Sequence, residues 1–154
     1  LQQVFHVHVD SLVETAEEIQ RVVDSTSVSF VLETGHMLIG GFDPLTFARD
    51  HADRIGLVHL KDVDMTIASP LNSDTISLMQ AVQRGIFPSL GDGDSPIAEC
   101  VTTLESQGYS GWYIIEQDVA LTEGLPADGE GPVRDVQRSV AYLRSIASAI
   151  PEHH

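Results

Sequence analysis

A chain of 154 residues, 42% of them hydrophobic, is long enough for one folded domain with a sizeable core and too short for two ordinary domains. Its 23 acidic residues against eight basic ones give a formal net charge of −15, which argues against binding to nucleic acid or to anionic membrane surfaces. No apolar run approaches the ~18–20 residues of a membrane-spanning helix. We therefore expect residues 1–154 to form a single domain with no transmembrane segment.

The cysteine content and the first residues favour a cytoplasmic protein. Cys100 is the only cysteine, so no disulfide can form within one chain and no zinc site of several thiolates can be built. The first residues do not show the basic, apolar and small-residue regions of a signal peptide. The resulting expectation is a reducing, cytoplasmic location.

The first part of the sequence predicts strands that alternate with helices. Residues 4–9 alternate in the manner of a strand, and Asp10 or Ser11 can cap the helix that follows. Asp43 and Pro44 have the residue types of a second helix start. The predicted elements are a strand at 4–9, a helix to about residue 24, a strand at 28–32, a helix at 44–52 and a strand at 56–60.

The second part continues this alternation with longer connections. The stretch 61–71 is expected to be irregular, because it carries Asp62, Asp64 and Pro70. The elements predicted after it are a helix at 72–83, a loop at 91–96, a helix at 96–107, a strand at 111–116, a loop at 119–131 and a helix at 133–149.

Four successive strand-and-helix units predict a parallel α/β fold with right-handed crossovers. The loops that follow strands, such as 61–71 and 119–131, are longer than most loops that precede strands. In open parallel sheets and in (β/α)₈ barrels, the loops at the carboxyl ends of the strands form the functional face. We expect the chemistry of this chain at those strand ends.

Histidine and carboxylate side chains gather at the four strand ends. The pairs are His6 and His8, Glu33 and His36, His59 and Lys61, and Glu116 and Asp118. Taken singly, each has a plain structural explanation, since a lone histidine on a strand is more often a core or edge residue than a ligand. Their repetition at four strand ends instead favours a shared metal site. Nitrogen and oxygen ligands without thiolates suit Mn²⁺, Fe²⁺, Co²⁺, Zn²⁺ or Mg²⁺.

Five groups of motifs, spread over roughly residues 3–147, point to a known family. They are His6-Val7-His8 with Val13-Glu14-Thr15, Glu33-Thr34-Gly35-His36 with Gly40-Gly41-Phe42-Asp43-Pro44, Val58-His59-Leu60-Lys61-Asp62, Phe87-Pro88-Ser89-Leu90-Gly91-Asp92-Gly93, and Gly108-Tyr109-Ser110-Gly111-Trp112 with Glu116-Gln117-Asp118. Together they resemble the xylose isomerase-like barrel superfamily of sugar phosphate isomerases and epimerases. The resemblance is closest to the inosose dehydratase branch.

The resemblance implies a (β/α)₈ barrel that binds one divalent metal, foremost Mn²⁺, through one ligand from each of its last four strands. The positions that match these ligands are His6, Glu33, His59 and Glu116. His36 and Lys61 match positions that face the substrate, and His8 and Asp118 lie beside the site. We expect Asp118 to share in substrate binding.

The activity that the resemblance implies is that of a metal-dependent lyase or isomerase for a polyol or keto-sugar. The metal would bind the substrate carbonyl and acidify the neighbouring C–H proton. Glu116 or His8 would remove that proton, and Lys61 or His36 would polarise an oxygen or protonate the leaving hydroxyl. The choice between the two bases stays open.

Two ligand positions depart from the family pattern. Glu33 stands where the family usually has Asp, so the carboxylate is one methylene further from the backbone. His6 stands where many epimerases have a Glu that also serves as a base. This second difference favours a lyase with one dominant base over an epimerase with two symmetric glutamates.

The length of the chain implies half a barrel. Four strand-and-helix units correspond to the C-terminal half of the family fold, and a half-barrel has two unpaired strand edges and an apolar concave face. We therefore expect a second copy of the chain or an N-terminal half to complete it. A non-catalytic half-barrel, acting as a subunit or binding module, is the alternative. An apurinic-site endonuclease shares the barrel, but the net charge of −15 argues against it.

Overall fold

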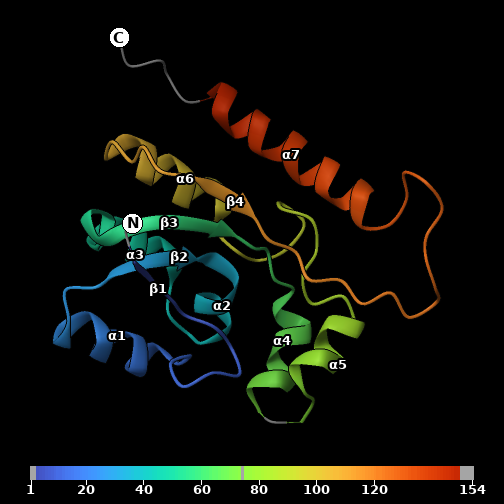
Figure 1. Cartoon of the computed structure of the whole chain (residues 1–154), viewed down its shortest axis with the longest axis horizontal. Helices are drawn as coiled ribbons and strands as arrows, with labels where there is room; N and C mark the ends of the chain where they lie inside the picture. The colour runs from blue at the N-terminus through green and yellow to red at the C-terminus, as the bar shows by residue number, and fades with distance from the viewer. Residues whose placement is uncertain (1–2, 74, 150–154) are drawn as a thin grey trace.

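The strands form one parallel sheet in which each strand pairs with the next one along the chain (Figure 1). The computed structural model describes residues 3–73 and 75–149. The strands are β1 (Val4–His6), β2 (Ser29–Glu33), β3 (Ile55–Leu60) and β4 (Tyr113–Ile115). Helices connect them throughout, so the predicted α/β fold, half of a TIM-type barrel, is confirmed.

Helices cover one face of this sheet, and others lie beyond the ends of its strands. They are α1 (Ala16–Ser25), α2 (Thr34–Ile39), α3 (Pro44–Asp50), the short 3₁₀ helix η1 (Ala52–Arg54), α4 (Met65–Asn72), α5 (Leu78–Gln83), α6 (Ile97–Ser106) and α7 (Pro132–Ala149). Figure 1 shows α4 and α5 beyond the carboxyl end of β3. In the part of the chain that the structure describes, no helix is long and apolar enough to cross a membrane.

The core lies between the sheet and the helices that cover it. Leu32, Val58 and Leu60 are fully buried, and they share one apolar cluster with Phe47 of α3 and Leu104 of α6. Each such side chain contributes about 2 kcal/mol through removal of apolar surface from water. Side chains alternate along a strand, so the residues next to Leu32, Val58 and Leu60 in β2 and β3 face the other side of the sheet, here called the inner face. The predicted ligands that lie within the strands, His6, Glu33 and His59, are on that face.

Arg54 fastens the end of α1 to the start of β2 at the opposite end of the strands. Its Nη1 donates to the carbonyl oxygen of Val23 (2.8 Å), and its Nη2 donates to those of Thr26 (3.0 Å) and Val28 (2.8 Å). The guanidinium carbon also lies 5.0 Å from the centre of the Phe30 ring. Carbonyl groups that would otherwise lack a partner at a helix end are thus satisfied by one side chain.

The first helix begins later than the sequence predicts. Thr15 caps α1: its Oγ1 accepts the N–H of Glu18 (3.4 Å), and the Glu18 carboxylate accepts the N–H of Thr15 (3.0 Å). Asp10 has a φ of 65°, which places it in a turn rather than at a helix start. The prediction of a cap at Asp10 or Ser11 is therefore wrong.

The helix α2 is not predicted from the sequence. It follows β2 without a loop, because the Glu33 side chain accepts the N–H of Gly35 (3.2 Å) and so caps the helix. A residue interpreted as a candidate ligand thus also starts a helix.

The stretch 61–71 is less irregular than predicted. Asp64 accepts the N–H of Thr66 (2.8 Å) and starts α4, which continues through Pro70. The helix predicted at 72–83 is correspondingly shorter, and α5 begins only after Ser77. Position 74 of that predicted helix lies outside the described residues.

The two outer strands are also shorter than predicted. β1 and β4 have three residues each, whereas the sequence predicts strands at 4–9 and 111–116. His8 and Glu116 therefore lie in the segments that follow these strands. Both segments still begin at the carboxyl ends of the sheet, where the functional face is expected.

Candidate metal centre

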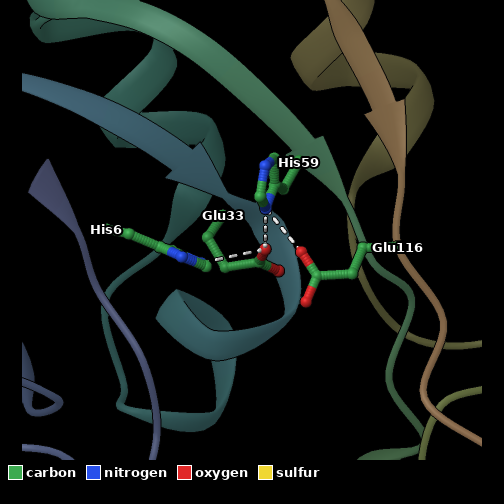
Figure 2. Close-up of side chains that lie close together, drawn as sticks. All are labelled: His6, Glu33, His59 and Glu116. Carbon is green, nitrogen blue, oxygen red and sulfur yellow. Dashed lines mark ion pairs between the residues drawn. The ribbon is translucent and has the colours of Figure 1, made fainter. Parts of the chain in front are cut away.

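Four side chains from the carboxyl ends of the four strands meet on the inner face of the sheet (Figure 2). His6 and Glu33 are the last residues of β1 and β2, His59 is near the end of β3, and Glu116 follows β4. One nitrogen or oxygen atom of each side chain lies within 4.8 Å of the atoms of the other three. The structure thus brings the four predicted ligands together.

Glu33 lies at the centre of this cluster. Its Oε2 is 3.5 Å from Nε2 of His6 and 3.3 Å from Nδ1 of His59, and His59 Nδ1 is also 2.5 Å from Oε2 of Glu116. Burial of Glu33 by itself would raise the pKa of its carboxyl group. His59, His6 and Lys61 outweigh burial and lower that pKa to about 2. Glu33 is therefore ionised at neutral pH.

His59 holds a proton more firmly than an ordinary histidine does. The Glu33 carboxylate raises the pKa of His59, partial burial acts in the opposite direction, and Glu116 raises the pKa further. An imidazole binds a metal ion through its deprotonated nitrogen. A metal ion at this cluster would therefore compete with a proton for His59.

Three atoms of the cluster have no hydrogen-bond partner among the described residues. They are Nε2 of His6, Oε2 of Glu33 and Nδ1 of His59, and all three are shielded from solvent. They lie close to one another and to Glu116, but without the geometry of a hydrogen bond. Buried polar atoms without partners are costly, and a cation between them would satisfy all three.

The donor set also fits a divalent metal. Two imidazole nitrogens and two carboxylate oxygens suit Mn²⁺, Fe²⁺, Co²⁺ or Zn²⁺. The two glutamates supply the negative charge that such an ion requires. Metal binding by these four residues stays a prediction, and the geometry specifies which side chains would hold the ion.

Lys61, the only lysine of the chain, is buried next to this cluster. Its Nζ donates to Oε1 of Glu116 (2.8 Å) and to Oδ2 of Asp118 (2.9 Å), and it lies 3.0 Å from Nε2 of His36. Burial lowers the pKa of Lys61, but Glu33, Glu116 and Asp118 outweigh it and raise the pKa above its ordinary value. Lys61 therefore carries a positive charge inside the protein.

The two remaining predicted residues, His36 and His8, stack on each other. Their ring centres are 3.8 Å apart, and the ring planes are inclined by 36°. Burial, together with the Lys61 charge, lowers the pKa of His36 to about 3, so this imidazole is neutral. His8 Nδ1 donates to the carbonyl oxygen of Val9 (2.6 Å), so Nε2 is the ring nitrogen that is left to accept a proton. All eight predicted site residues thus lie in one connected region, while their individual roles stay predictions.

Two further side chains of this region are not predicted from the sequence. The centre of the Phe87 ring lies 4.7 Å from Nζ of Lys61 and 5.9 Å from the centre of the His36 ring. Thr34 Oγ1 accepts the N–H of Lys61 (2.9 Å) and donates to its carbonyl oxygen (2.8 Å), which ties the start of α2 to the end of β3. Both residues belong to the recognised motifs, but no charge or spacing marks either of them.

Comparisons with known proteins agree with this arrangement. A family model described as "Xylose isomerase-like TIM barrel" matches residues 4–146. An inosose dehydratase from Geobacillus thermodenitrificans (strain NG80-2) is 37% identical over 123 residues, which cover 77% of this chain and 41% of that protein. The chain thus spans about two-fifths of the length of such curated relatives.

Solved structures show the same partial coverage. A xylose isomerase domain protein from Planctomyces limnophilus matches with a TM-score of 0.65 and 19% identity, over 97% of this chain and 48% of that one. The IOLI protein, solved with a bound zinc atom, matches with a TM-score of 0.64 and 15% identity, over 99% of this chain and 51% of that one. These likenesses support the half-barrel fold. The family model, which matches residues 4–146, shows that the chain belongs to the xylose isomerase-like TIM barrel family.

Proposed function

We propose that this chain carries the metal centre of a lyase or isomerase that acts on a polyol or keto-sugar. The observation that carries the proposal is the meeting of two imidazoles and two carboxylates at four successive strand ends, three of them with a buried atom that lacks a hydrogen-bond partner. A relative named inosose dehydratase supports the choice of a dehydratase. The metal we propose is Mn²⁺, and the same ligands also suit Co²⁺, Fe²⁺, Zn²⁺ or Mg²⁺.

The residues around the metal centre fit acid–base chemistry. The chemistry that a bound divalent ion supplies is Lewis acidity, which makes a proton beside a carbonyl group easier to remove. His8 is the better base, because its Nε2 lone pair is available, whereas the oxygens of Glu116 already face His59 and Lys61. This argument gives His8 the proton removal that the sequence alone leaves open.

Lys61 is the group that we assign to the substrate oxygen. It is charged, so it can polarise an oxygen or protonate a leaving hydroxyl. His36 is neutral and lies 3.0 Å from Nζ of Lys61, so its part is to hold that side chain in place. Asp118 is half exposed and is our choice to bind a substrate hydroxyl.

Metal titration tests this proposal directly. Calorimetric titration of the chain with Mn²⁺ should show one site, and His59→Ala should weaken binding at least about tenfold. His51→Ala is the matched control, because His51 lies between α3 and η1 and contacts Phe47 instead of the cluster. The control should bind Mn²⁺ as the wild-type chain does. Equal affinities of the two variants would contradict the proposed site.

We also propose that a second half-barrel completes the site, either an N-terminal half or a second copy of the chain. β1 and β4 each have only one neighbouring strand among the described residues. Trp112 and Ile114, beside and within β4, are 79% and 41% exposed, which supports a partner at this edge. In light scattering, the chain alone should be a dimer or a marginally stable monomer. A stable monomer that unfolds cooperatively would contradict both forms of the proposal.

A non-catalytic half-barrel is the second candidate function. The observation in its favour is that the chain spans only 41% of the inosose dehydratase that it matches. Such a subunit could bind the metal and still lack substrate contacts. Turnover of an inosose or keto-sugar by the chain with Mn²⁺ would separate the two candidates, because only the enzyme would show it.

A further inference from the structure

Asp62 is a buried carboxylate to which the proposed reaction gives no part. It comes directly after the lysine of the cluster, and it is 1% exposed. Its Oδ2 accepts the N–H groups of Gly91 (2.8 Å) and Gly93 (3.0 Å). Its Oδ1 accepts those of Ser95 (2.9 Å) and Val63 (2.9 Å). A single side chain thus receives four backbone donors, three of them from one loop.

The loop formed by residues 91–95 approaches Asp62 very closely. A Cβ atom at Gly93 would lie 2.5 Å from Oδ1 of Asp62 and 2.6 Å from the carbonyl oxygen of Val63. Asp94 adds two bonds: its N–H donates to the carbonyl oxygen of Val63 (2.8 Å), and its Oδ2 accepts the N–H of Met65 (2.8 Å). The 91–95 loop is therefore fixed to the end of β3 by contacts centred on Asp62.

The residues just before this loop carry Phe87 onto the lysine. Phe87 is 3% exposed, and its ring centre lies 4.7 Å from Nζ of Lys61. Between Phe87 and the loop, a turn is closed by a bond from the N–H of Asp92 to the carbonyl oxygen of Ser89 (3.0 Å). Because this connection is short and internally bonded, a shift of the 91–95 loop would move the Phe87 ring as well.

We propose that Asp62 is a positioning residue, which holds the 91–95 loop and thereby keeps the Phe87 ring over the Lys61 ammonium group. Lys61 and Asp62 are neighbours in the chain, and their hydrogen bonds show that the first side chain reaches the cluster and the second the loop. With Phe87 in place, water is kept from the lysine, and its attraction to Glu116 and Asp118 is less screened. The proposal rests on the proposed function only for the catalytic role of Lys61.

The presence of a single lysine makes this proposal measurable by NMR. Lysine labelled with ¹³C at Cε gives one resonance in the full chain, and the Phe87 ring shifts the attached protons upfield. In Asp62→Asn, an NH₂ group replaces one acceptor oxygen and faces backbone donors. We expect the Lys61 resonance to move to the position of an exposed lysine. We also expect the amide protons of Gly91 and Gly93 to exchange at least about tenfold faster than in the wild-type chain.

Three other variants serve as controls. Asp64→Asn makes the same change of charge nearby, but the Asp64 side chain caps α4 and does not bond to the 91–95 loop, so both signals should stay as in the wild-type chain. Phe87→Leu should move the Lys61 resonance without faster exchange at Gly91. Gly93→Ala disturbs the same contact from the loop side, and it should reproduce the effects of Asp62→Asn.

The outcomes separate positioning from a general effect on stability. A merely structural role of Asp62 would lower the unfolding temperature of Asp62→Asn and leave the Lys61 resonance of the folded chain unchanged, which would overturn the proposal. Global unfolding of both Asp62→Asn and Gly93→Ala would overturn it as well. If only Asp62→Asn unfolds, Gly93→Ala decides. All these measurements are made without metal, so a failure to bind Mn²⁺ would count against the proposed function alone.

Discussion

Acidification should destabilise the metal-free chain through His36. This side chain is fully buried, and burial together with the Lys61 charge holds its pKa at about 3. In the unfolded chain the imidazole has its ordinary pKa of 6.5. Between these two values the unfolded state binds more protons than the folded state. The contribution of His36 to stability is therefore present above its unfolded pKa and is lost as the pH falls toward the folded pKa.

Through His36, the free energy of unfolding falls by about 2 kcal/mol when the pH is lowered from about 7 to about 5. This value depends mainly on the unfolded pKa, because nearly all folded molecules still have a neutral His36 at about pH 5. His59 acts in the opposite direction: its pKa is raised, so its contribution is present at low pH and is lost as the pH rises through the folded pKa. Glu33 contributes little to the pH dependence in this window, since its contribution to stability is lost only as the pH falls from 4.5 to about 2.

Urea unfolding of the wild-type chain and of His36→Gln isolates this effect. His59 and Glu33 are present in both proteins, so their contributions cancel in the comparison. Between about pH 7 and about pH 5, the wild-type chain should lose about 2 kcal/mol more of its unfolding free energy than the variant loses. Equal losses would refute the reasoning, because His36 would then take up its proton in the folded chain as readily as in the unfolded one.

Two further predictions concern the metal centre and the far end of the sheet. Glu33→Asp removes the methylene by which this chain departs from its family, and it should bind Mn²⁺ at least as tightly as the wild-type chain in calorimetric titration. A large loss of affinity would show that the centre has adapted to Glu. Arg54→Ala leaves the carbonyl groups of Val23 and Val28 without their donor and should lower the unfolding free energy by about 2 kcal/mol in urea. Arg54→Lys should recover only part of the lost unfolding free energy, because an ammonium group cannot reach both carbonyls as the planar guanidinium does. A change below about 0.5 kcal/mol in Arg54→Ala would contradict this account.

The sheet could be predicted from the sequence because its signals are local. Apolar runs mark β2 and β3, and turn residues mark their ends. The carboxyl ends of parallel strands necessarily meet at one edge of a sheet, so the sequence alone predicts that the histidines and carboxylates of four strand ends lie together. The sheet topology confirms the predicted fold, and the family model confirms the predicted family.

The missed features depend on competition between side chains or on distant contacts. Thr15 with Glu18 is a better cap than Asp10 or Ser11, but several residues in that stretch are capable of capping. Glu33 has the pattern of a strand end, and its second use as the cap of α2 depends on how the chain turns after it. The contact of Phe87 with the lysine joins residues from different elements, and no periodic pattern encodes it.

The proposed metal centre takes one side chain from the end of each strand, and this arrangement has a consequence for folding. The four residues are far apart along the chain, so bringing them together closes three long loops, at a cost in chain entropy. An ion held by all four would act as a cross-link that spans the whole sheet, including the short outer strands β1 and β4. A chelating agent would then loosen those outer strands before the buried middle pair.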